Sequence, residues 1–339
     1  MNLLPQASGN RPRVACEISP QGVVVARSSN ASSPLSAVAR VELVEGAVVP
    51  GLKPGNVVDR VAVVAALRKA LESVDARPNT RNADITLVIP DAAVRVLLLD
   101  FDALTTKQVE ALPIVRFRLK KLLPFDADEA MVSYQVMSTS KGMVRVLAVA
   151  IPRDVLSEYE AVAHEAGFEP GAVVPSTLAA LAAVEGDGPS LLVNANGVGV
   201  TAAIVQNGVL LLHRSVDLQD HAGNAYTVAE VNVVPLPVTP IEETAQDLQR
   251  LPLSGEIAQA VSVAAAYFED TLATVPGVVL SAGPLGAEKL GRMLRQEGVG
   301  PEDGLSVREL VESSALLTDA TTASVPRAWL SSVTGALRG

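Results

Sequence analysis

The histidines, the cysteine and the serines are the side chains of this chain that could bind a metal ion or act as a nucleophile. His213 and His221 stand eight residues apart in a segment that we expect to be loop, and His164 and Cys16 are distant from both. Zinc sites use ligands at closer and more regular spacing, so these histidines predict surface or capping roles. The Gly-x-Ser-x-Gly pattern of a serine nucleophile is absent from the sequence as well. We therefore predict no catalytic residue and no metal ligand.

A second group with chemical potential is a cluster of positive charges. Arg116, Arg118, Lys120 and Lys121 place four cations within six residues of a chain whose net charge is −10. Such a cluster is typical of the solvated side of an amphipathic helix, and contact with an acidic partner or with anionic lipid headgroups is the alternative. The negative charge of the whole chain argues against nucleic-acid binding, which requires a basic surface.

Length and composition limit the class of fold that must position these residues. A chain of 339 residues is too long for one compact core, so two domains or one two-lobed fold are expected. Apolar residues make up 49% of the chain and aromatic residues only 3%, which indicates an α/β fold with cores of Val, Leu and Ala. The mean hydropathy is +0.32, yet no apolar run is long enough to cross a bilayer. The single Cys16 and the lack of a secretory signal predict a cytoplasmic protein.

Strands are predicted where short apolar runs lie between turn residues. Asn207-Gly208, between two such runs, is a strong signal for a hairpin turn. Pro90-Asp91 is a turn dipeptide between two further runs. The expected strands are 14–18, 23–27, 39–44, 85–89, 93–99, 131–137, 144–151, 191–193, 198–205, 209–212 and 278–282.

Helices are predicted from capping residues and apolar periodicity. Asn56 is expected to cap a first helix, and Thr105 with Gln108 to form the capping box of a second that ends at Leu123 and is kinked at Pro113. The apolar face of the first helix is expected at Val61, Val64, Leu67 and Leu71. Further helices are expected at 153–166, closed by Gly167, and at 256–272, 287–296 and 328–338, where Trp329 should pack in the core.

The region 116–175 resembles the PilM family of cytoplasmic, actin-like proteins that assemble type IV pili. The resemblance rests on the junctions Leu123-Pro124-Phe125, Tyr134-Gln135-Val136 and Gly167-Phe168-Glu169-Pro170. It implies an α/β, two-lobed, actin-like (ribonuclease H-like) fold with a small subdomain inserted in the first lobe.

The resemblance also implies a division of the chain. The first lobe is expected at 13–185, with its inserted subdomain at about 84–152, and the second at 186–339, from which the C-terminal helix returns to the first lobe. Residues 1–12 are expected to form a flexible leader. The Pro-rich segment 216–254 is expected to be a partly disordered or long surface loop.

In actin-like proteins two hairpin turns hold the phosphates of ATP and a third turn, from strand to helix, holds the adenosine. This sequence departs from the PilM pattern at most of these positions, and Glu17 is the only acid left in either phosphate turn. Each lost charge-assisted contact is worth roughly 1.5–3 kcal/mol, so the resemblance implies a degenerate site, no hydrolysis and at most weak binding of ATP with Mg²⁺. The candidate nucleotide-cleft residues are Glu17 and Ser19 in the first turn, Asn194, Asn196, Gly197 and Gly199 in the second, and Ser281 and Gly283 in the third. In the first turn Ala15 and Val24 stand where PilM proteins have Gly and Lys.

The leader Asn2-Leu3-Leu4-Pro5 resembles the cytoplasmic tail of PilN, the inner-membrane protein that PilM proteins bind. By that resemblance a PilN-like tail lies extended in a groove bounded by the inserted subdomain, with Phe117, Leu119 and Leu122 as candidate contacts. The leader could dock in this groove, dock in that of a neighbouring chain, or have no such role.

Three functions follow from these observations. The first is a non-catalytic adaptor at the inner face of the inner membrane, which binds the tail of a PilN-like protein, contacts other platform and motor components of the pilus, and reaches the membrane only through partners. The second is a slow ATPase in which Glu17 and Ser19 replace the lost groups. The third is a split cytoplasmic domain of a type II secretion platform protein, a class that is normally joined to a transmembrane helix.

Overall fold

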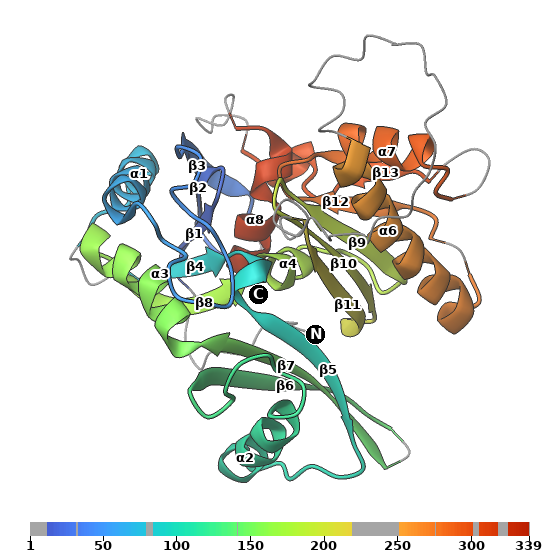
Figure 1. Ribbon diagram of the computed structural model, residues 1–339. Coiled ribbons are helices and arrows are strands. Elements are labelled where there is room, and N and C mark those ends of the chain that lie inside the picture. Colours follow the sequence, from blue (N-terminus) through green and yellow to red (C-terminus); the bar gives the residue numbers. More distant parts are fainter. Residues whose placement is uncertain are drawn as a thin grey trace, which may run out of the picture.

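The computed structural model describes residues 12–31, 33–78, 84–140, 142–218, 251–274, 276–300, 305–317 and 325–338. Two five-stranded sheets and one three-stranded sheet, with helices between and around them, form the framework of this part of the chain (Figure 1).

The first five-stranded sheet is built from residues that precede position 176. In spatial order its strands are β3 (Leu35–Glu42), β2 (Gly22–Ser28), β1 (Val14–Ser19), β4 (Asp84–Ile89) and β8 (Glu169–Pro175). β1, β4 and β8 run parallel, and both faces of this part of the sheet are covered, as parallel sheets require. The helices α1 (Arg60–Ser73) and α3 (Arg153–Ala166) cover one face, and the other is covered by α4 (Ser176–Leu181) and α8 (Ser331–Arg338).

The second five-stranded sheet repeats this plan further along the chain. Its strands are β11 (Val209–Asp217), β10 (Gly199–Gln206), β9 (Ser190–Ala195), β12 (Val279–Ala282) and β13 (Val307–Glu309). The helices α6 (Leu251–Leu272) and α7 (Ala287–Gln296) cover its outer side. Leu192, Ala203 and Leu280 on the opposite side share one apolar cluster with α4 and α8. These two helices therefore form a central layer between the two sheets, and α8 also contacts β1, β2 and β4.

A small subdomain lies between β4 and α3 in the sequence. It consists of a sheet of β5 (Arg95–Phe101), β7 (Met143–Pro152) and β6 (Ala130–Ser140), with the helix α2 (Gln108–Leu119). α2 covers one face of this sheet, which we call the outer face. The opposite, inner face bears Val96, Leu98 and Val149, which pack against the clusters of the main sheets. Figure 1 shows α2 at the far side of this sheet from the two large sheets.

Short 3-10 helices complete the described elements. They are η1 (Asp91–Ala93), η2 (Ser313–Ala315) and η4 (Arg327–Leu330). The helix expected at 328–338 is thus divided into η4 and α8. Trp329 is half-buried and stacks on the guanidinium of Arg40, 3.8 Å from the ring centroid.

Several local predictions are confirmed to the residue. α3 and α7 have the expected bounds, and α3 ends at Gly167 in the left-handed conformation, with φ 90°. Asn207 and Gly208 join β10 to β11 with φ values of 51° and 70°, as the hairpin required.

The start of α1 differs from the prediction. Its N-cap is Asp59, whose carboxylate accepts a hydrogen bond from the backbone amide of Ala62 at 2.9 Å. Asn56 is buried three residues earlier, and its carbonyl oxygen accepts from the amide of Gly51 at 2.8 Å and from the Tyr159 hydroxyl at 3.2 Å. Of the expected apolar face, Val64, Leu67 and Leu71 are buried, whereas Val61 is 81% exposed and Val63 is buried instead.

The capping box predicted for α2 was wrong. The helix begins at Gln108 with Lys107 as its N-cap, and Thr105 lies outside it with its hydroxyl oxygen 3.3 Å from the Lys107 amide. The helix continues through Pro113 and ends at Leu119, four residues before the expected end at Leu123. β8, α4 and β13 were not predicted at all.

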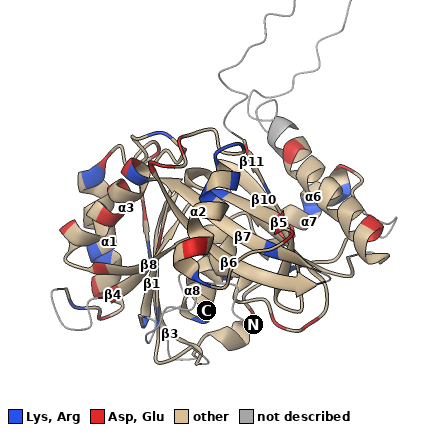
Figure 2. Ribbon diagram, turned by 90° about the horizontal axis from the view of Figure 1, so that it is seen from below, with Lys and Arg blue, Asp and Glu red and all other residues tan. Residues whose placement is uncertain are grey.

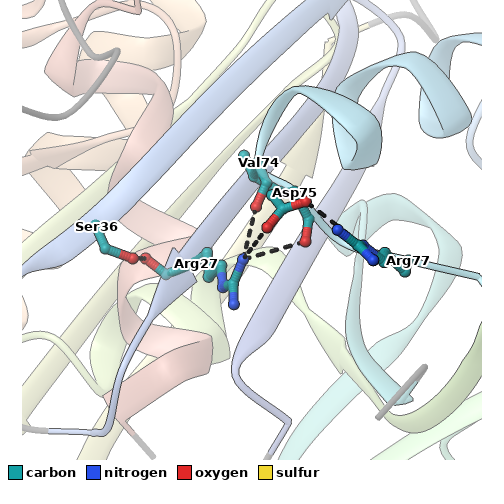
Figure 3. A network of polar contacts seen from close by, with 5 residues as sticks. All are labelled: Arg27, Ser36, Val74, Asp75 and Arg77. Atoms are coloured by element: carbon teal, nitrogen blue, oxygen red, sulfur yellow. Dashed lines mark hydrogen bonds and ion pairs between the residues drawn. The ribbon is translucent and has the colours of Figure 1, made fainter. Parts of the chain in front are cut away.

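The end of α1 is tied to the first sheet by a polar network (Figure 3). The Arg27 guanidinium donates to the carbonyls of Val74 and Asp75, each at 3.1 Å, and lies 3.7 Å from the Asp75 carboxylate. Arg77 reaches the other oxygen of that carboxylate at 3.7 Å. Ser36 donates to the Arg27 carbonyl, so three elements meet at Arg27.

Some expectations concern residues outside the described part of the chain. Of the leader 1–12 only Pro12 is described, beside Gly171 of β8. Of the segment 216–254, β11 reaches Asp217 and α6 begins at Leu251, while 219–250, including His221, lie outside the described residues. The predicted domain boundaries stay a prediction.

Candidate functional site

The three turns predicted to hold a nucleotide come together between the two large sheets. The β1–β2 turn belongs to the first sheet, and the β9–β10 turn and the β12–α7 junction belong to the second. β1 and β12 end at this place, and the carboxyl ends of parallel strands are where α/β sheets form ligand sites.

The first turn is held by a buried carboxylate. Glu17 on β1 accepts hydrogen bonds from the hydroxyls of Ser176 at 3.0 Å and Ser332 at 2.5 Å, which begin α4 and α8. Burial raises the pKa of the Glu17 carboxyl, and the two hydroxyl donors oppose this rise. Ser19 closes the turn itself, since its hydroxyl donates to the Gly22 carbonyl at 2.9 Å. Glu17 therefore joins β1 to the central helices.

The second turn satisfies its own backbone amides. The side-chain oxygen of Asn196 accepts from the amides of Val198 and Gly199, at 2.9 and 2.8 Å. Phosphate-binding turns leave such amides free to point at the anion. A Cβ at Gly197 would lie 3.2 Å from the Gln21 amide nitrogen, so this turn nearly touches the first. The turn presents a closed surface to the cleft.

The third turn makes the close backbone approach that its glycine permits, but a protein side chain occupies the space. Gly283 has φ 92°, and a Cβ there would clash with the Asn194 side-chain oxygen and lie 2.9 Å from the Ala195 carbonyl oxygen. The Leu285 amide donates to the same Ala195 carbonyl at 3.2 Å. β9 and the third turn are thus packed directly against each other.

Asp91, which the sequence analysis treated only as a turn residue, is the centre of a polar network between the lobes. Its carboxylate accepts from the amide and hydroxyl of Thr177, at 3.0 and 2.5 Å, and from the Thr201 hydroxyl at 3.0 Å. The Asn194 amide nitrogen lies 3.0 Å from the hydroxyls of both Ser176 and Thr177. First-lobe groups are therefore bound to second-lobe groups. The available signal was the position of Asp91 directly after the buried, predicted strand β4, whereas the strand before Ser176 was not predicted.

The cleft that remains has a volume of about 20 Å³, about the space of one water molecule. Its lining contains no Lys or Arg among the described residues, and Glu17 is its ionisable group. A nucleotide needs cations and free amides for its phosphates. The lining is formed by Glu17, Ser19, Gln21, Ser176, Ala180, Asn194, Asn196, Ala282, Gly283, Pro284, Ala328, Trp329, Ser331 and Ser332.

The predicted cleft residues are thus mostly brought together. Glu17, Ser19, Asn194, Asn196 and Gly283 line the cleft, as the sequence analysis expected. The lining also includes residues that the sequence analysis missed, among them Gln21, Ser176, Trp329 and Ser332.

The other three predicted cleft residues lie beside it. Gly197 and Gly199 belong to the second turn, and Ser281 is buried within β12 beneath the third.

The three candidate partner contacts, Phe117, Leu119 and Leu122, do not lie on one surface. Leu119 is completely buried between α2 and the sheet, so it is a core residue and was wrongly assigned to a surface. Phe117 and Leu122 are 67% and 50% exposed at α2 and the turn that follows it. α2 lies on the outer face of the sheet, away from the inner face, which packs against the clusters of the main sheets.

The two described histidines, His164 and His213, lie near carboxylates of the protein. The His164 Nδ1 atom lies 3.3 Å from the Glu169 carboxylate, and His213 is on β11, not in a loop as expected. Burial lowers the pKa of His213, and the nearby charge of Asp91 opposes this change. Among the residues that the structure describes, no group of His, Cys, Asp and Glu is arranged to hold a metal, and no helix could span a membrane.

The comparisons with known proteins concern the fold. No family model matches the chain, and no curated protein matches its sequence. A chain of the PilM-PilN type IV pilus biogenesis complex superposes with a TM-score of 0.69, at 16% identity, over 96% of this chain and 99% of that one. This chain has the actin-like fold. The predicted two-lobed α/β architecture with a small inserted subdomain is confirmed.

More distant solved structures were also found. The ethanolamine utilization protein EutJ from Carboxydothermus hydrogenoformans gives a TM-score of 0.47 at 14% identity, over 100% of this chain and 95% of that one. The cytoplasmic domain of EpsL from the type II secretion system of Vibrio cholerae gives 0.39 at 15% identity, over 68% and 85%.

Proposed function

We propose that this protein is a cytoplasmic, actin-like adaptor of type IV pilus biogenesis that binds the tail of a PilN-like inner-membrane protein and does not hydrolyse ATP. The observation that carries the proposal is the closed cleft of an otherwise complete actin-like fold. The similarity to a chain from a PilM-PilN complex supports the choice of partner. Through that partner the adaptor would contact other platform and motor components of the pilus.

The absence of hydrolysis is argued from the groups that the cleft already uses. The amides of Val198 and Gly199 are bound by Asn196, and the Glu17 carboxylate is bound by two serines. Opening the cleft for ATP would break these bonds, at roughly 1.5–3 kcal/mol for each one made to a charged group. The described lining offers no cation to replace them. Binding of Mg·ATP should therefore be weak or undetectable.

The tail site is argued from the edge of the first sheet. β8 pairs only with β4 in the described structure, so its other edge is available to an added strand. Ala172 of β8 and Val96 and Val149 of the inner face are half-buried and pack against the same apolar cluster. An extended apolar tail could pair with β8 and cover these side chains. This surface lies within the region that the resemblance implied, but not at Phe117.

A peptide-binding experiment tests the tail site. A labelled Asn-Leu-Leu-Pro tail peptide is titrated with the wild type, with Ala172→Arg and with Phe117→Ser, by fluorescence polarisation. The Arg side chain would block the apolar surface beside β8, so Ala172→Arg should lower the affinity more than tenfold, while Phe117→Ser should not change it. Equal binding by all three would place the tail elsewhere, and no binding to the wild type would refute the adaptor. Thermal unfolding of each variant checks the fold.

A nucleotide experiment separates the adaptor from a slow ATPase. Titration calorimetry with Mg·ATP and a phosphate-release assay are run on the wild type and on Glu17→Ala. We expect no heat of binding and no release above background. Micromolar binding, or release that falls in Glu17→Ala, would support the ATPase in place of the adaptor.

A further inference from the structure

The outer side of α2 exposes an unusual number of large apolar side chains. Val109 is 87% exposed, Phe117 67%, Leu122 50% and Ile114 44%. Single exposed apolar residues are common, but several on one short helix mark an interaction surface. This surface is separate from the closed cleft and from the inner face of the small sheet.

The helix geometry groups these residues. Val109, Pro113 and Phe117 follow one another at four-residue intervals and share one side of α2. The buried residues Ala111 and Val115 lie on the opposite side, against the sheet. The apolar surface continues beyond the helix at Val136, 46% exposed, which pairs with Val146 of the outer face.

Cations surround the apolar side chains. Residues 107–122 contain five Lys or Arg and one acid, Glu110, in a chain of net charge −10. Glu110 is held by Lys107 at 3.0 Å. Figure 2 looks onto this side of α2, with its Lys and Arg segments in blue.

Two of the cations are available for an external partner. Arg116 is turned inward to the carbonyls of Ala127 and Ala130, and Lys120 lies 2.5 Å from Asp128. Arg118 and Lys121 are exposed, and the described residues give their side chains no hydrogen bond or ion pair.

We propose that the outer side of α2 is a docking surface for a membrane rich in anionic lipid. Phe117, Val109 and Ile114 would enter the headgroup boundary, and Arg118 and Lys121 would meet the lipid phosphates. The apolar side chains project from the outer side of the helix. The exposed cations complement anionic headgroups and the apolar side chains beside them fit the headgroup boundary, which is the pattern of amphipathic helices that bind membranes.

The proposed contact is direct and independent of the adaptor proposal. It differs from the expectation that the chain reaches the membrane only through partners. The acids Asp126 and Glu129 in the following turn limit its strength, so the contact should be weak, reversible and sensitive to salt.

Vesicle flotation tests the proposal with the full chain. Vesicles of phosphatidylcholine with about one-third phosphatidylglycerol are compared with pure phosphatidylcholine at low salt. We expect binding to the first and none to the second. Arg118→Glu/Lys121→Glu should lower binding at least about 25-fold, from about fivefold for each basic residue removed, and Phe117→Ser should lower it about tenfold.

Matched variants exclude a general effect of charge or apolarity. Lys53→Glu/Lys69→Glu makes the same change in net charge at exposed positions outside the subdomain, and Val61→Ser removes an exposed apolar residue from α1. Neither should alter flotation. No flotation of the wild type, or equal losses in both charge variants, would overturn the proposal.

A site-specific probe adds an independent readout. Cys16 is completely buried, so a cysteine at Phe117→Cys or Val61→Cys can be labelled alone with an environment-sensitive dye. Anionic vesicles should shift the emission of the dye at 117 to the blue and leave that at 61 unchanged. Shifts at both positions, or at neither, would contradict docking through α2 and favour a protein partner for this surface.

Discussion

The close packing of α8 on α4 predicts that a side chain added at Gly335 destabilises the protein. Both helices lie in the central layer between the two large sheets, and Gly335 is completely surrounded there. A Cβ added at this position would clash with the Ala179 carbonyl oxygen and lie 2.8 Å from the Ala179 carbonyl carbon. Because these are backbone atoms of a neighbouring helix, no rotamer change can relieve the contact, and Gly335→Ala must move one helix.

Two opposing terms set the size of the effect. Alanine is favoured over glycine within a helix by about 0.5–1 kcal/mol. Overpacking in a dense core costs about 1–3 kcal/mol, and more where backbone must shift. The clash here is with backbone, so we expect a net loss of about 2 kcal/mol in the free energy of unfolding.

Urea unfolding measures this loss, and Gly291→Ala on α7 is the matched control. A Cβ at Gly291 would meet side-chain atoms of Arg295 and Val307 at 3.4 Å, which is ordinary contact. Gly291→Ala should therefore leave stability unchanged or raise it. If Gly335→Ala proved as stable as wild type, the close approach of the two helices, and with it the position of Ser332 beside Glu17, would be wrong.

Three further changes test the cleft and the tail site. Burial raises the pKa of Glu17, so the folded protein binds this proton more tightly than the unfolded chain, and the stability of the protein falls as pH rises through the folded pKa. Glu17→Gln removes that fall. In urea titrations the stability of this variant relative to the wild type should therefore be higher at about pH 8 than at about pH 4.5. Asp91→Asn leaves the hydroxyls of Thr177 and Thr201 facing an amide group, and calorimetry should show a loss of about 2 kcal/mol, with the exposed Asp187→Asn as an unaffected control. Deletion of residues 2–5 should tighten binding of the tail peptide if the leader competes for the same groove, and an unchanged affinity would refute that competition.

The parts of the fold that were predictable from sequence are those fixed by local chemistry. Gly167 ends α3 because the left-handed conformation excludes most other residues, and Asn207-Gly208 imposes the β10–β11 turn for the same reason. β8 and α4 were missed because two prolines and a glycine conceal the strand, and tertiary pairing with β4 decides its structure. Asn56 has the chemistry of a helix cap but is used by Tyr159 and Gly51, which only the folded chain brings near.

The candidate site was also predictable only in part. The three turns were found by resemblance, and the structure brings them together. Their hydrogen bonds were not foreseeable, because the partners of Glu17 are at positions 176 and 332. Leu119 was assigned wrongly for another reason. It follows the buried Ala111 and Val115 at four-residue intervals, so it lies on the side of α2 that faces the sheet.

The polar residues of the cleft hold the two lobes together by hydrogen bonds. Hydrogen bonds join the first lobe to the second, from Asp91, Ser176 and Thr177 to Asn194 and Thr201. Glu17 accepts a further hydrogen bond from Ser332 of α8. A ligand changes a conformational equilibrium only if it binds the two states of the protein with different affinities. ATP would form few hydrogen bonds in a cleft whose donors already have partners within the protein. The relative position of the lobes is then set by the protein alone. An adaptor built in this way would present its tail site permanently, and control of assembly would have to come from its partners or from the membrane.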